Sequence, residues 1–564
     1  TRGFIFVMMK LTSVLFLTVH FIFVVADILV TIPDGTIRGR EEYSQRGIKF
    51  FSFQQIPFAK PPLGELRFKE PQPVDKWEGV LNATTNTKVC YQTYGDDRTV
   101  GLENEDCLYL NVFTPRYPSS TNSLPVMFEI YGGGFMNGAA TLDTFGPHYL
   151  MENDVIVVSV NYRVAAFGFL STGDMVIPGN YGLKDQQMGL KWVQKNIKYF
   201  GGDPKKVTIF GESAGASSVA YHLLSKGSQG LFRAAIAASG TALSPWAYQR
   251  DHKEYAYKLA SGIDENFKAN STSEDLLNFL RSVPASKIKD VTRIFPEDLH
   301  NDQITEGFFF APVVEPAHEN AFLTEKMYSA IENGRANRVP LMIGMCEEEL
   351  LIKANDPSFS QYLKLIDEDQ SILVNKNMRL TDEKDITNAA NAIHSLYTNG
   401  RFEDHPGAAI RFFSDSGFSK GIIRHAQLQS KFSDVYFYQF NYHGRLSGNT
   451  GPFFEGAGKI RHGEDLTYIW AWDNQTYLNS FPQEDVLTNE RIRQLYTDFA
   501  KHLNPTPSES ELLENIIWPK VKPDDFQYLD FNNTLTIKSN PKADVYSKWL
   551  DIYEKMVVKP YDTF

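Results

Sequence analysis

Short runs of β-branched and aromatic residues recur along this chain, and each ends at a glycine or a polar turn. The clearest runs are residues 126–131 (VMFEIY), 155–160 (VIVVSV) and 207–210 (VTIF). Such runs are typical of strands that are buried on both faces of a parallel sheet. Residues 341–343 and 435–440 have the same character. We therefore expect them to be later strands of the same sheet.

Helical patterns alternate with these strands. Between the second and third runs, apolar residues of the segment 182–200 recur at near-helical spacing, namely Leu183, Leu190, Val193, Ile197 and Phe200. Strand–helix alternation predicts an α/β fold with a mostly parallel central sheet and helices on both faces. The segment 251–332 is more polar and helix-like, and we expect it to form a cap-like insertion.

The pattern continues without a clear boundary. The chain has 564 residues, which on typical domain sizes suggests several domains. However, no Ser/Gly-rich or Pro-rich linker and no internal repeat interrupts the motifs described below. We therefore expect one catalytic domain over residues 27–564.

The N-terminal segment has the layout of a secretory signal peptide. Met9-Lys10 precedes an apolar run over 11–25, and Val24-Val25-Ala26 resembles a small-residue cleavage site. We expect residues 1–26 to be removed, with the residues before Met8 or Met9 an upstream artefact. A membrane anchor is the alternative, but the run is short for a span. The C-terminal residues match no retrieval or lipid-anchor signal. Secretion to the extracellular space without a stable membrane anchor is expected.

Charge and sequence signals agree with that route. The formal net charge of −12 argues against a nucleic-acid partner, which requires a basic surface. Three cysteines are present, and Cys90 could pair with Cys107, although other pairings stay open. Four Asn-X-Ser/Thr sequons are candidate glycosylation sites, at Asn82, Asn270, Asn474 and Asn532.

The strongest chemical signal is Gly211-Glu212-Ser213-Ala214-Gly215. It directly follows the 207–210 strand and precedes a potential helix over 216–224. A serine in that context sits on a tight strand–turn–helix elbow, which exposes its hydroxyl at a helix N-terminus. Glycines flank it because side chains there would collide with the elements packed against the turn. The motif alone also occurs by chance, but its position between strand and helix favours a nucleophile.

A serine nucleophile requires donors for the oxyanion. Gly132-Gly133-Gly134 follows the 126–131 strand. Hydrolases that carry their serine on a strand–turn–helix elbow place backbone donors at such a glycine turn. The N–H of Ala214, the residue after the serine, would be a further donor. A flexible glycine turn is the simpler interpretation, but the later serine elbow makes it much less attractive.

The base and the acid are less evident. In this arrangement the acid and then a histidine follow the serine, and the later histidines are His394, His405, His425, His443, His462 and His502. His462 stands out in a turn-like segment, Arg461 to Asp465. For the acid, Glu347, Glu348 and Glu349 follow the 341–343 strand, and a solvated acidic loop would look the same. Physical reasoning does not choose among these three.

Longer motifs resemble the carboxylesterase/cholinesterase family of α/β-hydrolases over nearly the whole mature chain, and insect esterases most of all. The matching stretches are FQQIPFA from Phe53, PPLGELRF from Pro61, WEGV from Trp77, EDCLYLNV from Glu105, and FGGDP from Phe200 leading into GESAG. The resemblance implies the α/β-hydrolase fold. It also implies a secreted serine esterase that acts on small-molecule carboxylic esters through an acyl-enzyme, without a metal or organic cofactor.

The resemblance also assigns residues. Ser213 matches the family's nucleophile, His462 in HGEDLTY its base, and Glu349 its acid. Gly133, Gly134 and Ala214 match the oxyanion donors, and Cys90 with Cys107 matches the first disulfide. Three departures are Tyr131 where histidine is frequent, Leu350 where glycine follows the acid, and the lack of the other common disulfide, which would leave Cys346 free.

Two other functions compete with a general carboxylesterase. A juvenile hormone esterase-type enzyme is the first, although many of those resemble GQSAG at the elbow where Glu212 stands here. A non-catalytic cholinesterase-like binding protein is the second, but such members lose triad residues that this chain keeps. A cholinesterase is disfavoured because the segment between Cys90 and Cys107 contains no tryptophan to stack on a choline ammonium.

Overall fold

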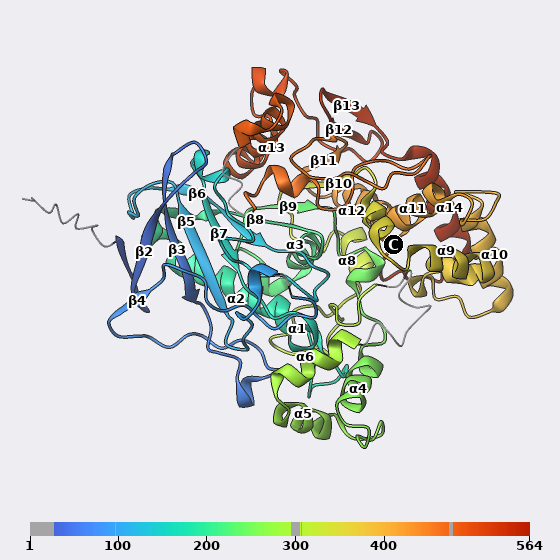
Figure 1. Cartoon of the computed structure of the whole chain (residues 1–564), viewed down its shortest axis with the longest axis horizontal. Coiled ribbons are helices and arrows are strands. Elements are labelled where there is room, and N and C mark those ends of the chain that lie inside the picture. The colour runs from blue at the N-terminus through green and yellow to red at the C-terminus, as the bar shows by residue number, and fades with distance from the viewer. Residues whose placement is uncertain (1–27, 96, 295–304, 306, 473–477) are drawn as a thin grey trace, which may run out of the picture.

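A mixed sheet of 13 strands organises the molecule (Figure 1). The computed structural model describes residues 28–95, 97–294, 305, 307–472 and 478–564. The signal-peptide prediction for 1–26 therefore lies outside the described residues. The strands are β1 (Ile28–Ile32), β2 (Gly35–Tyr43), β3 (Lys49–Pro57), β4 (Val80–Asn82), β5 (Tyr109–Thr114), β6 (Leu124–Ile130), β7 (Ile156–Val160), β8 (Gly202–Glu212), β9 (Ala234–Ala238), β10 (Leu341–Cys346), β11 (Val435–Phe440), β12 (Gln527–Phe531) and β13 (Leu535–Ser539).

The central strands of the sheet run parallel. The order is β1-β2-β3-β5-β7-β6-β8-β9-β10-β11-β12-β13, with β4 paired to β2. All pairs from β7 through β12 are parallel, whereas β1, β2, β3 and β5 at one edge and β13 at the other pair antiparallel. Parallel strands place their carboxyl ends at one edge, which is where open α/β sheets bind ligands.

Helices cover both faces of this sheet. They are α1 (Ala165–Phe169), α2 (Tyr181–Asn196), α3 (Ala214–Leu224), α4 (His252–Ile263), α5 (Ser273–Ser282), α6 (Ala285–Ile294), α8 (Met327–Glu332), α9 (Phe359–Glu368), α10 (Glu383–His394), α11 (Pro406–Ser414), α12 (Lys420–Gln429), α13 (Gln483–His502) and α14 (Ala543–Met556). Along β8, Ile209 packs in the same core cluster as α2 and α3, and Phe210 packs in the cluster that contains α13. Successive strand residues point to opposite faces, so the two clusters are the two layers.

The structure confirms the predicted α/β class, and the element boundaries differ in detail. The strand expected at 207–210 is part of the longer β8, which runs from Gly202 to Glu212. The early start was not predicted because the Gly-Asp-Pro sequence there carries no strand signal. The expected helix over 182–200 is α2 followed by a 3₁₀ turn, Ile197–Phe200. Helix α3 starts at Ala214, two residues before the expected start.

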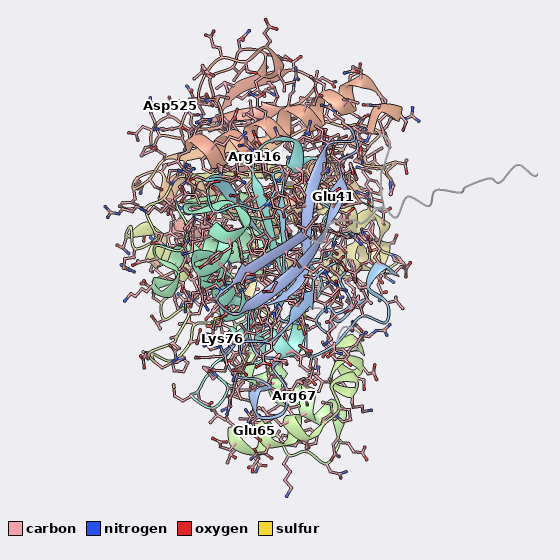
Figure 2. The ribbon with its side chains drawn as sticks, turned by 90° about the vertical axis from the view of Figure 1, so that its left-hand side faces the viewer. Glu41, Glu65, Arg67, Lys76, Arg116 and Asp525 are labelled. Carbon is pink, nitrogen blue, oxygen red and sulfur yellow. A yellow bond between two sulfur atoms is a disulfide. The ribbon has the colours of Figure 1, made fainter. Side chains whose placement is uncertain are left out.

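In the expected insertion, α4, α5 and α6 lie together as a helical lobe at the lower end of Figure 1. Helix α6 packs on α1, whereas α8 lies apart from the lobe and packs on α3 and α12. The insertion therefore covers helices that themselves cover the sheet. Arg67, at the lower end of Figure 2, attaches the lobe, since it donates to the carbonyl oxygens of Leu280 (2.9 Å) and Val283 (2.6 Å). It also forms a bidentate ion pair with Glu105.

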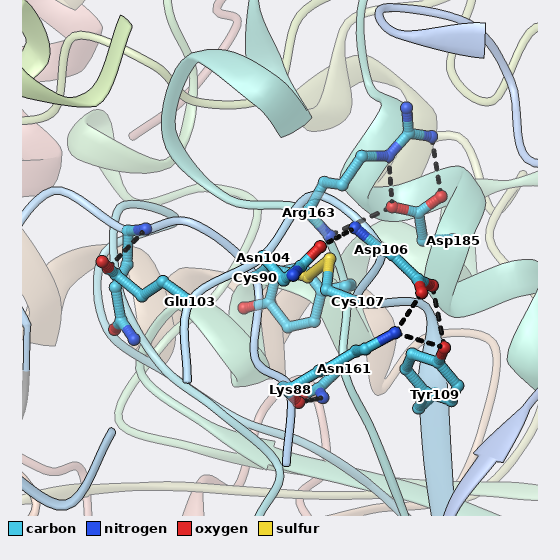
Figure 3. The surroundings of a disulfide bond; sticks show 12 residues. Lys88, Cys90, Glu103, Asn104, Asp106, Cys107, Tyr109, Asn161, Arg163 and Asp185 are labelled. Atoms are coloured by element: carbon cyan, nitrogen blue, oxygen red, sulfur yellow. Dashed lines mark hydrogen bonds and ion pairs between the residues drawn. A yellow bond between two sulfur atoms is a disulfide. The ribbon is translucent and has the colours of Figure 1, made fainter. Parts of the chain in front are cut away.

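A disulfide joins Cys90 to Cys107, just before β5 (Figure 3). This is the pairing that the family resemblance implied. Beside it, the Tyr109 hydroxyl donates to Asp106 (2.8 Å), and Lys88 forms an ion pair with the same carboxylate. The bridge closes a surface loop with a sequence separation of 17 residues. Within the described residues, no helix combines the length and apolar character that a membrane span requires.

Candidate active site

The carboxyl ends of four parallel strands, β6, β8, β10 and β11, precede the predicted site residues. Strands β6 and β8 pair in parallel, with Ile130 opposite Gly211. The glycine triplet after β6 therefore lies beside Ser213 after β8. The loop after β10 carries Glu349, and a longer connection after β11 carries His462. Residues that are more than 300 positions apart in the sequence thus meet at one edge of the sheet.

Ser213 occupies a backbone conformation that few residues adopt. It lies between β8 and α3 with a φ of 58° and a ψ of −123°. Its N–H donates to Ala238 O at 2.9 Å. Non-glycine residues with positive φ are strained and gather at functional sites. A Cβ on Gly211 or Gly215 would overlap the carbonyl oxygen of Ile130. The flanking glycines are therefore required by the close contact between the turn and β6, as the sequence predicted.

The glycine loop presents free backbone donors. Gly133 and Gly134 have φ values of 106° and 64°, and the Gly133 carbonyl closes the turn by accepting from Met136 N and Asn137 N, both at 3.0 Å. Among the described residues, the N–H groups of Gly133, Gly134 and Ala214 have no hydrogen-bond acceptor. Such unpaired N–H groups at a turn and a helix N-terminus attract negative charge.

His462 is oriented by Glu349. Its Nδ1–H donates to Glu349 Oε2 at 2.5 Å, and its backbone N–H donates to the Glu349 carbonyl oxygen at 3.0 Å. The second carboxylate oxygen, Oε1, accepts from Cys346 N at 2.8 Å. Both oxygens of this fully buried carboxylate are therefore occupied. A bond from Nδ1 to the acid leaves Nε2 as the nitrogen available for proton transfer.

The other two glutamates of the run make different contacts. Glu348 is buried, accepts from Gly458 N at 3.0 Å and lies 3.9 Å from Lys542 Nζ. Glu347 accepts from Lys459 N at 2.8 Å. Only Glu349 of the three contacts His462 in the structure, a distinction that residue type and order do not provide.

A second carboxyl group faces the histidine. Glu212 Oε1 lies 3.1 Å from His462 Nε2, without a hydrogen bond between them. Burial raises the pKa of Glu212, and the positive charge of His462 lowers it only in part. Burial also lowers the pKa of His462, but the negative charges of Glu212 and Glu349 outweigh that effect and raise it. In the sequence, Glu212 stands out only where GQSAG has glutamine; its acidic side chain next to the serine was the available signal for this contact.

A cavity of about 380 Å³ contains the reactive groups. Ser213, His462, Gly133 and Gly134 line it together with Glu212. Its wall is largely aromatic, and the lining aromatic residues are Trp246, Phe308, Phe412, Phe413 and Phe418. The Phe418 ring lies 4.7 Å from the His462 ring, between centroids. His462 is the histidine of the described residues that lines this cavity.

The three departures from the family pattern have different surroundings. Tyr131 is buried below the site, where its hydroxyl donates to Tyr162 O at 2.9 Å. Leu350 lines the cavity, and its N–H donates to Ser414 Oγ at 3.0 Å. Cys346 is a buried free thiol whose backbone holds Glu349. Each departure is thus accommodated without displacing the histidine–acid pair.

Three of the four sequons lie within the described residues. Asn82 and Asn270 are exposed and Asn532 is half-exposed, so their side chains are accessible to a glycosyltransferase. Asn474 lies outside the described residues.

Comparison with known proteins identifies the family. The carboxylesterase family model matches residues 26–549. The chain is 33% identical over 531 residues to a juvenile hormone esterase of Tribolium castaneum, covering 89% of this chain and 88% of that protein. It is 34% identical over 536 residues to a carboxylic ester hydrolase of Bombus ignitus, covering 91% and 92%.

A solved structure agrees with these relatives. The crystal structure of juvenile hormone esterase from Manduca sexta with OTFP covalently attached superposes with a TM-score of 0.82 at 30% identity, covering 94% of this chain and all of that one. The sheet of the present structure, with its serine elbow, glycine loop and paired histidine and glutamate, is consistent with that similarity. The chain therefore belongs to the carboxylesterase family and is a carboxylic ester hydrolase of the α/β-hydrolase fold.

Proposed function

We propose that this enzyme is a serine carboxylesterase in which Ser213 is the nucleophile, His462 the general base and Glu349 the orienting acid. The observation that carries the proposal is His462 itself. Its Nδ1 is bonded to Glu349 while its ring lines the same cavity as Ser213. A base oriented by a buried carboxylate beside an exposed hydroxyl is the arrangement that activates a serine.

Acylation follows from these positions. His462 Nε2 accepts the Ser213 proton as Oγ bonds to the ester carbonyl carbon. The carbonyl oxygen becomes negatively charged and accepts hydrogen bonds from the N–H groups of Gly133, Gly134 and Ala214. The carbon–oxygen bond to the alcohol then breaks, and the alcohol leaves with the proton that His462 returns.

Deacylation repeats the sequence with water. His462 accepts a proton from water as its oxygen attacks the acyl carbon, and the same N–H groups bind the oxyanion. The bond to Ser213 Oγ breaks, the carboxylic acid is released, and Oγ recovers the proton. Glu349 stabilises the imidazolium in both halves without itself being protonated.

The cavity suggests the class of substrate. Its size and aromatic wall suit esters with a medium-sized apolar group next to the carbonyl. Juvenile hormone hydrolysis is a second candidate, because relatives from Tribolium castaneum and Heliothis virescens, each 33% identical, are juvenile hormone esterases. Turnover of juvenile hormone at submicromolar concentration would favour that specific function, and millimolar KM would oppose it.

We also propose that residues 1–26 direct export and that 27–564 act as one secreted catalytic domain, with Asn82, Asn270, Asn474 and Asn532 as glycosylation sites. N-terminal sequencing of protein secreted by insect cells tests the cleavage after Ala26. A peptide:N-glycosidase mass shift tests the sequons.

The decisive experiment is hydrolysis of p-nitrophenyl acetate and p-nitrophenyl butyrate by the secreted protein and by Ser213→Ala. We expect turnover in the wild type and a loss on the order of 10⁴-fold or more in the variant. Folded wild type without turnover would favour the non-catalytic binding protein. Undiminished turnover in Ser213→Ala would remove Ser213 as the nucleophile.

A further inference from the structure

One lysine lines the cavity beside its aromatic residues. Lys353 lies on the 3₁₀ turn Glu349–Asn355, four residues after the proposed acid, and its side chain is part of the cavity wall. Its ammonium nitrogen lies 5.1 Å from the centre of the Phe413 ring and 5.4 Å from that of Tyr362. Cation–π contacts of this kind stabilise an ammonium only in part.

Lys353 has no carboxylate partner among the described residues. No Asp or Glu oxygen forms an ion pair with its ammonium there, and no hydrogen bond to it is formed. Burial lowers the pKa of Lys353, and the charge of Asp356 offsets this only in part. A desolvated cation without a counter-ion is unfavourable, so such groups are rare in cores that serve only for packing.

Two other lysines with low exposure have carboxylate partners. Lys184 lies 2.7 Å from a Glu315 oxygen and 3.1 Å from a Glu70 oxygen. Lys542 lies 2.9 Å from Asp415. Lys184 and Lys542 are thus neutralised by carboxylates, whereas the ammonium of Lys353, which lines the cavity, is neighboured by aromatic rings.

We propose that Lys353 binds an ionised carboxylate on the substrate, so that the enzyme favours esters that carry a second, negatively charged carboxyl group. The inference rests on the proposed function, because it assumes that esters occupy this cavity next to Ser213. A lysine suits this role, since its ammonium is a compact charge with three donors. In a cavity of low polarity, a charge-assisted hydrogen bond to it is stronger than in water.

The second carboxylate can belong to either half of the ester. In the acyl half, the substrate is a monoester of a dicarboxylic acid; in the alcohol half, it is an acylated hydroxy acid. Matched pairs separate the two. Monomethyl adipate against methyl hexanoate tests the acyl half, and 4-acetoxybutanoate against butyl acetate tests the alcohol half. Each hydrolysis releases one acid, so all four are followed by pH-stat titration at neutral pH.

The variants are Lys353→Met, which keeps length without charge, and Lys353→Arg, which keeps the charge. Lys364→Met on α9 is the control, because Lys364 is 61% exposed and pairs only with Glu368 at 3.8 Å. In Lys353→Met we expect the ratio of kcat/KM for the anionic ester to that for its neutral partner to fall about 10- to 100-fold on at least one arm. The ratio, rather than the neutral-ester kcat/KM alone, is the readout, and Lys353→Arg and Lys364→Met keep the wild-type ratio within about threefold.

Thermal unfolding gives an independent readout. Removing a half-buried cation that has no carboxylate partner among the described residues leaves the Tm of Lys353→Met equal to or above that of the wild type. Equal losses for anionic and neutral esters together with a lower Tm would show that Lys353 only braces the wall, and would overturn the proposal. An unchanged ratio on both arms would also overturn it.

Failure of this inference is distinguishable from failure of the proposed function. If the wild type hydrolyses p-nitrophenyl butyrate and methyl hexanoate but its preference is independent of Lys353, only the carboxylate-binding role is wrong. If the wild type hydrolyses none of the neutral esters and Ser213→Ala changes nothing, the serine esterase itself is wrong.

Discussion

The serine and the histidine of this site share a cavity but are held by different interactions. Ser213 is positioned by backbone packing: a strained turn, two flanking glycines against Ile130 and a hydrogen bond to Ala238. His462 is positioned by charge, with Glu349 at Nδ1 and Glu212 near Nε2. The nucleophile should therefore be sensitive to added volume, and the base to changes of charge and pH.

The largest effect is expected for a change of charge next to His462, in Glu349→Gln. The amide keeps an oxygen for Cys346 N but does not stabilise the imidazolium, and it offers an N–H to Nδ1, which favours the wrong tautomer. We expect kcat to fall on the order of 10⁴-fold with little change in KM. Glu347→Gln, whose side chain meets Lys459 N instead, is the control and should keep wild-type kcat. A loss below tenfold in Glu349→Gln would mean that another group orients His462.

Gly215→Ala tests how sensitive the position of Ser213 is to added side-chain volume, without a change of charge. The added methyl would overlap the Ile130 carbonyl oxygen, so α3 must shift and carry Ser213 with it. A displacement near 1 Å is expected to cost on the order of 10²-fold in kcat/KM. Gly95→Ala, where a Cβ meets nothing within 4 Å, is the matched control and should leave p-nitrophenyl butyrate hydrolysis unchanged. Normal turnover in Gly215→Ala would show that the elbow tolerates volume.

A smaller effect, on pH dependence, is expected for Glu212→Gln. His462 acts as a base only when neutral, so activity rises with pH through its pKa. Removing the negative charge of Glu212 lowers that pKa, because this charge is one of the causes that raise it. The acidic limb of the kcat/KM profile should therefore move to lower pH, and activity at high pH should change only several-fold. An acidic limb that stays in place or moves to higher pH would contradict the influence of Glu212 on His462.

The smallest effect on turnover is expected for the double variant Cys90→Ser/Cys107→Ser. Neither cysteine lines the cavity, so kcat should stay within about twofold at temperatures where the protein is folded. Opening the 17-residue loop should lower the free energy of unfolding by about 2–4 kcal/mol, measured by thermal or denaturant unfolding. Lost turnover in a folded double variant would mean that the loop also shapes the active site.

Local sequence patterns predicted the surroundings of Ser213 well. The strand, the GESAG turn and the following helix are adjacent in sequence, so their order alone indicated an elbow at Ser213. The strands of the parallel core were predicted for the same reason. The antiparallel strands β1, β2, β3 and β5 on one side of the sheet carried weaker signals, because a strand such as β2 contains few apolar residues among partly exposed polar ones.

The assignment of the acid that orients His462 depended first on the family resemblance and then on the geometry of the structure. Three successive glutamates have the same chemistry, and residue order gave no reason to choose Glu349 over its neighbours. The choice came from family motifs, and the 2.5 Å contact to His462 became visible only in the structure. The other aromatic residues of the wall, such as Phe308 and Phe418, were also unpredicted, since they belong to segments that are distant in sequence.

What the amino-acid order decides here is local: where strands end, where a serine can turn tightly, and which residue types carry chemistry. Those features depend on backbone conformation and on neighbours within about ten positions, which the chain itself specifies. What the folded molecule decides is proximity. Side chains that meet across the sheet decide which carboxylates surround His462. They also decide whether a given lysine has a counter-ion. Electrostatic energies vary with distance and burial, and only the tertiary structure fixes both.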